Sequence, residues 1–161
     1  MAEIIYRPAE MADTQRVRDL IGELAAFEKL EHQFTGSTYD LAEALFSDPP
    51  AAQCLVAEET GHGVVGYAIF FETFSTFRMK RGLWLEDLYV TPSRRRMGIG
   101  KRLLEIVARI AVKHGCARFE WSVLDWNKNA QSLYRSIGAD IMPDWRIYRL
   151  EGGALRKFGS E

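Results

Sequence analysis

A short run of cations and glycines at residues 94–101, Arg-Arg-Arg-Met-Gly-Ile-Gly-Lys, carries the strongest chemical signal in the chain. It follows an apolar, strand-like stretch and opens a segment with helical periodicity. Backbone N–H groups at the start of a helix lack partners and carry partial positive charge, and glycine lets a bulky phosphate approach them. The run therefore predicts a cradle for a phosphorylated ligand, with charge-assisted hydrogen bonds from Arg94, Arg95, Arg96, Lys101 and Arg102.

The spacing of the glycines excludes two common phosphate-binding motifs. Gly98 and Gly100 do not fit the Gly-x-x-x-x-Gly-Lys-Ser/Thr pattern of a nucleoside triphosphate loop, nor a dinucleotide fingerprint. Another phosphorylated ligand is therefore needed. The alternative is a solvated basic turn whose glycines only start a helix.

Adjacent acids and a helical tyrosine are further candidates for chemistry. Glu86 and Asp87 stand in an apolar strand-like stretch, where alternation predicts that their side chains point to opposite faces. Only one of the two side chains should then face a site on a given side of the sheet. Tyr134 is a candidate proton donor. It also lies on the same helical stripe as Ala130, Leu133 and Ile137, so the alternative is a core residue.

Periodicity and turn signals predict the elements that position these residues. Helices are expected at residues 14–29, 38–46, 99–114 and 127–137, and strands at residues 4–7, 53–58, 64–73, 83–90, 118–124 and 145–150. The order is β-α-α-β-β-β-α-β-α-β, without an internal repeat or a linker-like segment. We expect an α/β (α+β) fold in one domain over residues 1–161, with a central mixed, mostly antiparallel sheet flanked by helices.

Composition narrows the class of protein. The 161 residues have a net charge of −1, so the chain has no excess positive charge to attract nucleic acid or an anionic membrane. The start of the chain lacks a secretory signal pattern, and the longest apolar stretch, residues 64–71, is under half of the roughly 18 residues that a membrane span needs. These features predict a cytoplasmic protein.

Cysteines and histidines show no ligand spacing. Cys54 and Cys116 lie far apart in the sequence, and we expect both to be reduced thiols in the core. His32, His62 and His114 are isolated and read as surface or turn residues, so no metal is expected.

The glycine run and several scattered motifs resemble a known enzyme family. Arg95-x-x-Gly98-x-Gly100 after a strand ending Leu88-Tyr89-Val90 resembles the coenzyme A pyrophosphate loop of the GNAT acetyltransferase superfamily. Over nearly the whole chain, the sequence resembles the spermidine/spermine (diamine) N-acetyltransferases, and most of all their thialysine N-epsilon-acetyltransferase branch. The segments that carry this are residues 23–30, 54–58, 75–76, 85–87, 123–127 and 154–157.

The resemblance implies an acetyl-CoA site and a GNAT fold. Backbone groups of Leu88, Tyr89 and Val90 would meet the acetyl and pantetheine portion, with an N–H near Leu88 stabilising the oxyanion. The pyrophosphate would lie on Arg95, Arg96, Met97, Gly98, Ile99, Gly100 and Lys101. The thiol end would be lined by Asn127, Lys128, Asn129 and Ala130.

The resemblance also implies catalytic roles. Glu86 would remove the proton from the amine, directly or through water, and Tyr134 would give a proton to the departing thiolate. Asp87 would be structural. The acceptor pocket would contain Phe27, Glu28, Glu120, Trp121 and Ser122, whose apolar wall and acids suit an aliphatic amine.

One segment departs from the polyamine acetyltransferase pattern. Where that family places an acid and a tryptophan, this chain has Thr76 and Arg78, followed by Lys80 and Arg81. Such cations suit the carboxylate of a thialysine- or lysine-like amino acid. A solvated turn, or contact with the coenzyme of a neighbouring subunit, is an alternative.

The predicted activity is transfer of an acetyl group to the primary amine of a thialysine- or lysine-like amino acid or a diamine. Polyamine acetylation, protein acetylation and a non-catalytic CoA sensor are the alternatives. The resemblance further implies a homodimer, in which Trp145 and the last strand serve a partner chain.

Overall fold

The computed structural model describes residues 2–160 of the chain. These residues form two compact units, residues 2–126 and residues 127–160. The first unit contains the sheet and three α-helices, and the second contains two α-helices. The prediction of one domain over residues 1–161 stays a prediction.

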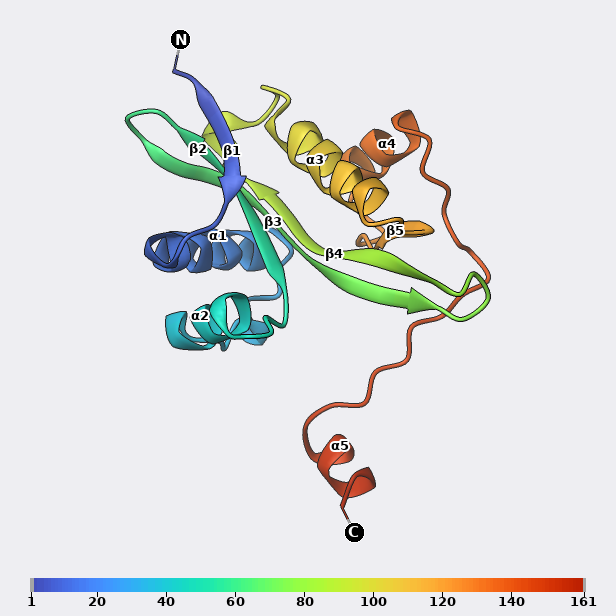
Figure 1. The fold of residues 1–161 in the computed structure, drawn as a ribbon. Coiled ribbons are helices and arrows are strands. Elements are labelled where there is room, and N and C mark those ends of the chain that lie inside the picture. Colours follow the sequence, from blue (N-terminus) through green and yellow to red (C-terminus); the bar gives the residue numbers. More distant parts are fainter. Residues whose placement is uncertain (1, 161) are drawn as a thin grey trace. The chain divides into compact units, whose positions relative to one another are not determined.

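A five-stranded sheet forms the centre of the first unit, with its strands side by side in chain order (Figure 1). The first four strands pair with one another in antiparallel fashion, and the fifth pairs with the fourth in parallel. This is the mixed, mostly antiparallel sheet that the sequence predicts. The strands are β1 (Ile4–Pro8), β2 (Gln53–Glu59), β3 (Gly63–Ser75), β4 (Lys80–Val90) and β5 (Arg118–Trp121).

Helices cover both faces of this sheet. Figure 1 shows α1 (Thr14–Phe27) and α2 (Thr38–Phe46) on one face and α3 (Ile99–Lys113) on the other. Short 3-10 turns at Met11–Asp13, Glu31–Gln33 and Pro92–Arg94 connect the elements. The α1 face is sealed by a core that includes Val17, Leu20, Val56, Tyr67 and Ile69.

Local sequence explains where these helices begin and end. The Ser37 hydroxyl accepts a hydrogen bond from the Asp40 N–H, and the Asp40 carboxylate accepts one from the Ser37 N–H, which starts α2 as a capping box. Gly115 follows α3 with a φ of +68°, a conformation that glycine adopts without steric cost. Both signals are readable from the sequence.

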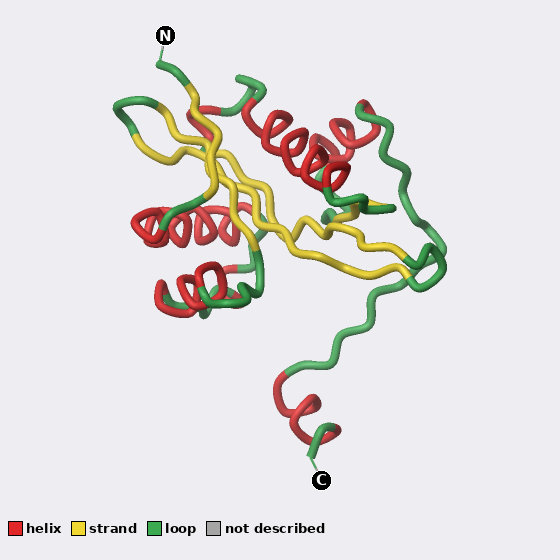
Figure 2. The backbone as a smooth tube through the Cα atoms, in the orientation of Figure 1, coloured by secondary structure: helices red, strands yellow, loops and turns green. Residues whose placement is uncertain are grey.

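The second unit corrects the prediction for the end of the chain. It contains α4 (Lys128–Ser136) and α5 (Gly152–Phe158), and the predicted strand at residues 145–150 is wrong because this segment is loop (Figure 2). Trp145, Ile147 and Tyr148 are 75, 77 and 95% exposed. Strand propensity alone does not make a strand, since the backbone also needs a partner to complete the ladder. The strand predicted at residues 118–124 is shorter for the same reason, because pairing with β4 ends at Trp121.

The cysteines agree with the expectation of reduced thiols. Cys54 is buried in the α1-facing core, and Cys116 is partly buried and also free. Across residues 2–160, no helix is long and apolar enough to cross a membrane.

Gly66 provides a test of the sheet. A Cβ there would lie 2.9 Å from the Tyr89 carbonyl oxygen and 3.2 Å from Val90 Cγ2, so Gly66→Ala forces β3 and β4 apart. We expect the free energy of unfolding to fall by about 1 to 3 kcal/mol in chemical denaturation. Gly36→Ala is the matched control, because a Cβ at Gly36 meets nothing within 4 Å. Equal stability of the two variants would contradict this account of the β3–β4 contact.

Candidate active site

An extra residue interrupts β4 at Glu86. Across the β3–β4 ladder, Ile69 lies opposite Asp87 and Phe70 lies opposite Leu85, so Glu86 has no counterpart on β3. This is a β-bulge, a feature that bends a strand, re-aims its side chains and is common beside active sites.

The bulge places two carboxylates on one face of the sheet. Phe71 and Ile69 are two residues apart on β3 and share a face, so their partners Trp84 and Asp87 share it too. The Trp84 indole Nε1 donates to Glu86 Oε2 at 3.1 Å, which brings Glu86 to the same side. The prediction that Glu86 and Asp87 point to opposite faces is therefore wrong, because the bulge breaks the alternation. We call this surface, defined by Trp84, Glu86 and Asp87, the acidic face.

Asp87 is the more buried of the two acids. Burial, and then the neighbouring charges of Glu86 and Glu28, raise the pKa of Asp87 to about 6, against a smaller lowering by Tyr67. The Tyr67 hydroxyl donates a long hydrogen bond, 3.4 Å, to Asp87 Oδ2. Glu86 is exposed. Asp87 is thus mostly ionised at neutral pH and becomes protonated under mildly acidic conditions.

The end of α1 contributes an aromatic and acidic wall. The Phe27 ring lies 5.5 Å from the Trp126 ring between centroids, and the Arg95 guanidinium lies 5.1 Å from the Phe27 centroid and 5.3 Å from that of Tyr89. Phe27 is 41% exposed, so it is not a simple core residue. Burial raises the pKa of Glu28, the residue that ends α1. The structure therefore brings Phe27 and Glu28 together with the acidic face, through the electrostatic effect of Glu28 on Asp87.

The predicted pocket residues of β5 divide between the two faces of the sheet. Glu120 lies opposite Trp84 and joins the acidic face, whereas Trp121 lies opposite Leu85 and belongs to the other face. Ser122 follows the end of the strand and is exposed. The register therefore supports Glu120 as a pocket residue and argues against the side chain of Trp121 in the same wall.

Three arginines of the glycine run are engaged by protein groups. Arg94 Nε lies 2.6 Å from Glu59 Oε2, a carboxylate that is 5% exposed, and this pair ties the run to β2. Arg102 pairs with Glu105 at 2.7 Å. Arg95 stacks on the aromatic wall described above. The sequence analysis missed Glu59, whose only signal is an acid at the end of a buried strand.

The remaining cations and the glycines fit an anionic ligand. Within residues 2–160, Arg96 and Lys101 form no ion pair with a carboxylate. Gly98 caps α3 with a φ of +77°. A Cβ at Gly100 would meet only Val90 Cγ2, at an ordinary 3.7 Å, so the packing of the chain does not itself require glycine there. Glycine at this position leaves room for the close approach of a phosphate to the start of α3, which stays a prediction.

The last residues of β4 lie beside this run. Pairing with β5 covers only Gly82–Leu85, so β5 does not cover the edge of β4 at residues 86–90. The Tyr89 hydroxyl donates to Glu23 Oε2 at 3.2 Å, which turns that side chain toward α1. The Val90 carbonyl accepts from Arg95 Nε at 3.0 Å. Backbone groups at the uncovered edge, including those of Leu88, are the ones predicted to meet the ligand.

The remaining predicted residues lie on α4. The Asn127 Oδ1 accepts from the Ala130 N–H at 3.2 Å and caps the helix. Lys128 and Asn129 are exposed, and Tyr134 is partly buried. Tyr134 lies one turn beyond Ala130 on the same face of the helix. These residues belong to the second unit, so their roles stay predictions.

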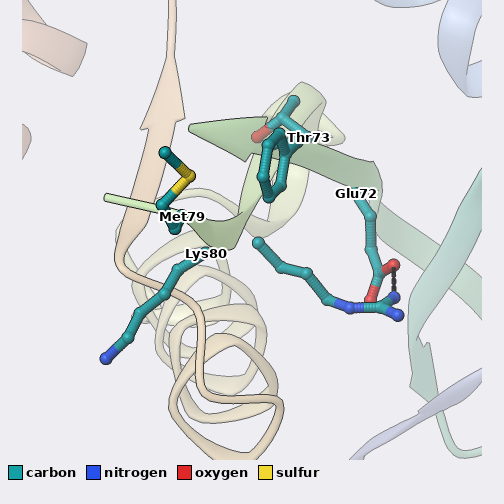
Figure 3. Close-up of a pocket in the computed structure, with 6 residues that line it drawn as sticks. Glu72, Thr73, Met79 and Lys80 are labelled. Carbon is teal, nitrogen blue, oxygen red and sulfur yellow. Dashed lines mark hydrogen bonds and ion pairs between the residues drawn. The ribbon is translucent and has the colours of Figure 1, made fainter. Parts of the chain in front are cut away.

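A hollow at the end of the β3–β4 hairpin contains part of the predicted basic segment (Figure 3). Its lining consists of Glu72, Thr73, Phe74, Met79, Lys80 and Arg81. Arg81 forms an ion pair with Glu72, and the amine of Lys80 points away from that pair (Figure 3). One of the three predicted cations is therefore already neutralised.

The hairpin is remote from the acidic face of the same chain. Lys80 and Glu86 are six residues apart on β4, which corresponds to about 20 Å along a strand. This exceeds the span of a lysine-like amino acid from its side-chain amine to its carboxylate. A lysine-like amino acid therefore does not by itself span the backbone positions of Lys80 and Glu86 in one chain.

Residues 2–160 contain no cluster of three or more His, Cys, Asp and Glu side chains that would hold a metal ion. The chemistry that the arrangement offers comes from carboxylates, aromatic rings, cations and backbone N–H groups.

Comparison with known proteins gives a consistent answer. The model of the acetyltransferase (GNAT) family matches residues 19–139. A thialysine N-epsilon-acetyltransferase from Mus musculus is 39% identical, with 98% of each chain covered. An L-ornithine N5-acetyltransferase from Arabidopsis thaliana is 30% identical, with 93% of this chain and 85% of the relative covered. Among solved structures, an integron cassette protein from the mobile metagenome of V. cholerae superimposes with a TM-score of 0.81 at 27% identity, covering 98% of both chains.

Gly100 tests the phosphate cradle. Gly100→Ala fits the helix and should keep or raise stability, by about 0.5 to 1 kcal/mol, because alanine favours a helix over glycine. A methyl group at the start of α3 should nevertheless weaken binding of acetyl-CoA by roughly tenfold or more, as measured by calorimetry. Gly153→Ala, the same change in the first turn of α5, is the control and should bind normally. Unchanged affinity in a folded Gly100→Ala variant would refute the cradle.

Proposed function

The chain belongs to the acetyltransferase (GNAT) family and is an acetyl-CoA-dependent N-acetyltransferase, and we propose that its acceptor is the side-chain amine of a thialysine-, lysine- or ornithine-like amino acid, or of a short diamine. The observation that carries this proposal is full-length similarity to enzymes that are named for such acceptors. The acidic face supports it independently.

A cationic aliphatic amine matches the acidic face. Glu86, Asp87 and Glu120 lie on one side of the sheet, and Glu28 lies close enough to raise the pKa of Asp87. Phe27 supplies an apolar wall. Several carboxylates beside exposed aromatic rings attract a cation that carries a hydrocarbon chain.

The reaction requires the amine to lose its charge. A side-chain amine with a pKa near 10.4 is almost fully protonated at neutral pH, and deprotonation then costs about 4 to 5 kcal/mol. In our proposal Glu86 binds the ammonium group and removes a proton, directly or through water. The sulfur of thialysine makes its amine less basic, which eases this step.

The glycine run and the end of β4 hold the coenzyme in this proposal. Acetyl-CoA supplies the acetyl group as a thioester. Arg96, Lys101 and the N–H groups at the start of α3 bind its pyrophosphate. Leu88, Tyr89 and Val90 bind through the backbone, and the segment 127–130 lines the thiol end. Tyr134 donates a proton to the departing thiolate.

A polyamine is the second candidate acceptor. Lys80 lies about 20 Å from Glu86 along β4 and Arg81 is paired with Glu72, so in one chain these cations only weakly repel a polyamine bound at the acidic face. If the family homodimer forms, the hairpin of one subunit is available to the site of another, where its cations would favour the carboxylate of an amino acid.

Parallel assays of thiol release from acetyl-CoA test the acceptor. Thialysine, lysine, ornithine, spermidine and short diamines are compared at equal concentrations. We expect kcat/KM to be highest for the amino acids or diamines. Preference for spermidine would replace the first candidate with the second, and silence with every amine would reject the proposed function.

Tyr134→Phe tests the acid. Loss of the hydroxyl should lower kcat by roughly 10- to 100-fold without changing acetyl-CoA affinity, since the proton is needed only when the thiolate leaves. Thiol release and calorimetry measure the two quantities. Tyr39→Phe, the same change at a residue of α2 that is 72% exposed, is the control. Full activity of Tyr134→Phe would remove this residue from the mechanism.

A further inference from the structure

We propose that Asp87, with Tyr67 as its hydrogen-bond donor, is a second proton acceptor for the substrate amine and works beside Glu86. This inference rests on the proposed function and concerns the acceptor site. The sequence predicts only a structural role for Asp87, because alternation along a regular strand would direct it away from Glu86.

The β4 bulge is the geometric basis of the proposal. It leaves Glu86 without a partner on β3 and keeps Asp87 opposite Ile69, so both carboxylates face the α1 side. In a regular strand only one acid would reach a ligand on that side. The bulge therefore supplies two acceptors at one site.

Tyr67 fixes the position of Asp87. This tyrosine is 0% exposed in the α1-facing core, and its hydroxyl donates to Asp87 Oδ2 at 3.4 Å. Three titratable groups from three elements affect Asp87: Glu86 on β4, Glu28 at the end of α1 and Tyr67 on β3. Cys54 on β2 lies beyond Tyr67 and affects the tyrosine.

The stoichiometry of amide formation calls for two acceptors. The ammonium nitrogen starts with three protons and ends with one, so it loses two. One must leave before the nitrogen lone pair can form the N–C bond, and the second leaves the cationic nitrogen of the tetrahedral adduct as the C–S bond breaks. The departing thiolate gains one proton from its own donor, and the net proton goes to solvent. With two carboxylates on one face, the second proton has an acceptor even before the first carboxylate has released its proton to solvent.

The titration of Asp87 suits this role. Burial and the charges of Glu86 and Glu28 raise its pKa from 3.8 to about 6, closer to the operating pH than that of an ordinary carboxylate. The folded protein thus binds this proton more tightly than the unfolded chain does. Stability should therefore fall as the pH rises from about 4 to about 6, and the cost persists at neutral pH.

Asp87→Asn provides the test, with Asp19→Asn as a matched change at an exposed aspartate. The pH dependence of kcat/KM for the amine is measured at saturating acetyl-CoA, and acetyl-CoA affinity is measured separately. We expect Asp87→Asn to lower kcat/KM roughly tenfold or more at neutral pH. The fall of kcat/KM on the acid side of the pH profile, near pH 6 in the wild type and called the acid limb here, should disappear in this variant. Its melting temperature should exceed that of the wild type by a few degrees at pH 7.5, and the difference should close near pH 4.

Tyr67→Phe separates a role in proton transfer from a merely structural one. Loss of the donor removes the contribution that lowers the pKa of Asp87, so the acid limb should move to higher pH. If Tyr67 had only a structural role, Tyr67→Phe would change the stability of the protein and leave the pH of the acid limb unchanged.

The two proposals fail in different ways. If the wild type releases thiol and Asp87→Asn matches it within twofold with the same acid limb, Asp87 is not an acceptor. If the wild type is inactive with every amine while acetyl-CoA binds, the proposed function itself is wrong, and this inference falls with it.

Discussion

One inserted residue in β4 governs the geometry of the acceptor site. Because Glu86 has no partner on β3, the alternation of side chains shifts by one, and two neighbouring acids come to the same side of the sheet. The bulge also coincides with the end of pairing between β4 and β5 at Leu85. A single irregularity therefore gathers the carboxylates and marks the start of the part of β4 that β5 does not cover.

The glycine run is held in place by contacts of Arg94 and Arg95 with other parts of the chain. Glu59 neutralises Arg94 and anchors the start of the run to β2. Arg95 stacks on Phe27 and Tyr89 and donates to the Val90 carbonyl, which connects the run to the end of α1 and to β4. Among the described residues, Arg96 and Lys101 form no ion pair with a carboxylate. The contacts of Arg94 and Arg95 thus place the glycine run beside the end of α1 and the end of β4.

The concentration of negative charge on the acidic face opposes folding. Burial and like charges raise the pKa of Asp87, which means that its ionised form is disfavoured in the folded protein. Tyr67, which donates to Asp87, lies in the buried core beneath α1, and burial of that core favours folding. Strongly perturbed pKa values of this kind cluster at functional sites.

Much of the fold follows from the sequence alone, because its signals are local. Helical stripes predicted four helices that the structure contains, the glycine run predicted a phosphate cradle, and scattered motifs indicated the family. The tertiary structure alone decided which side chains meet. Strand register placed Asp87 beside Glu86 and Trp121 on the opposite face, and residues 145–150 stayed loop for want of a strand partner. Contacts such as Arg94 with Glu59, 35 residues apart, decided which cations are free. Periodicity is written in neighbouring residues, whereas register, bulges and ion pairs depend on segments that meet only after the chain has folded.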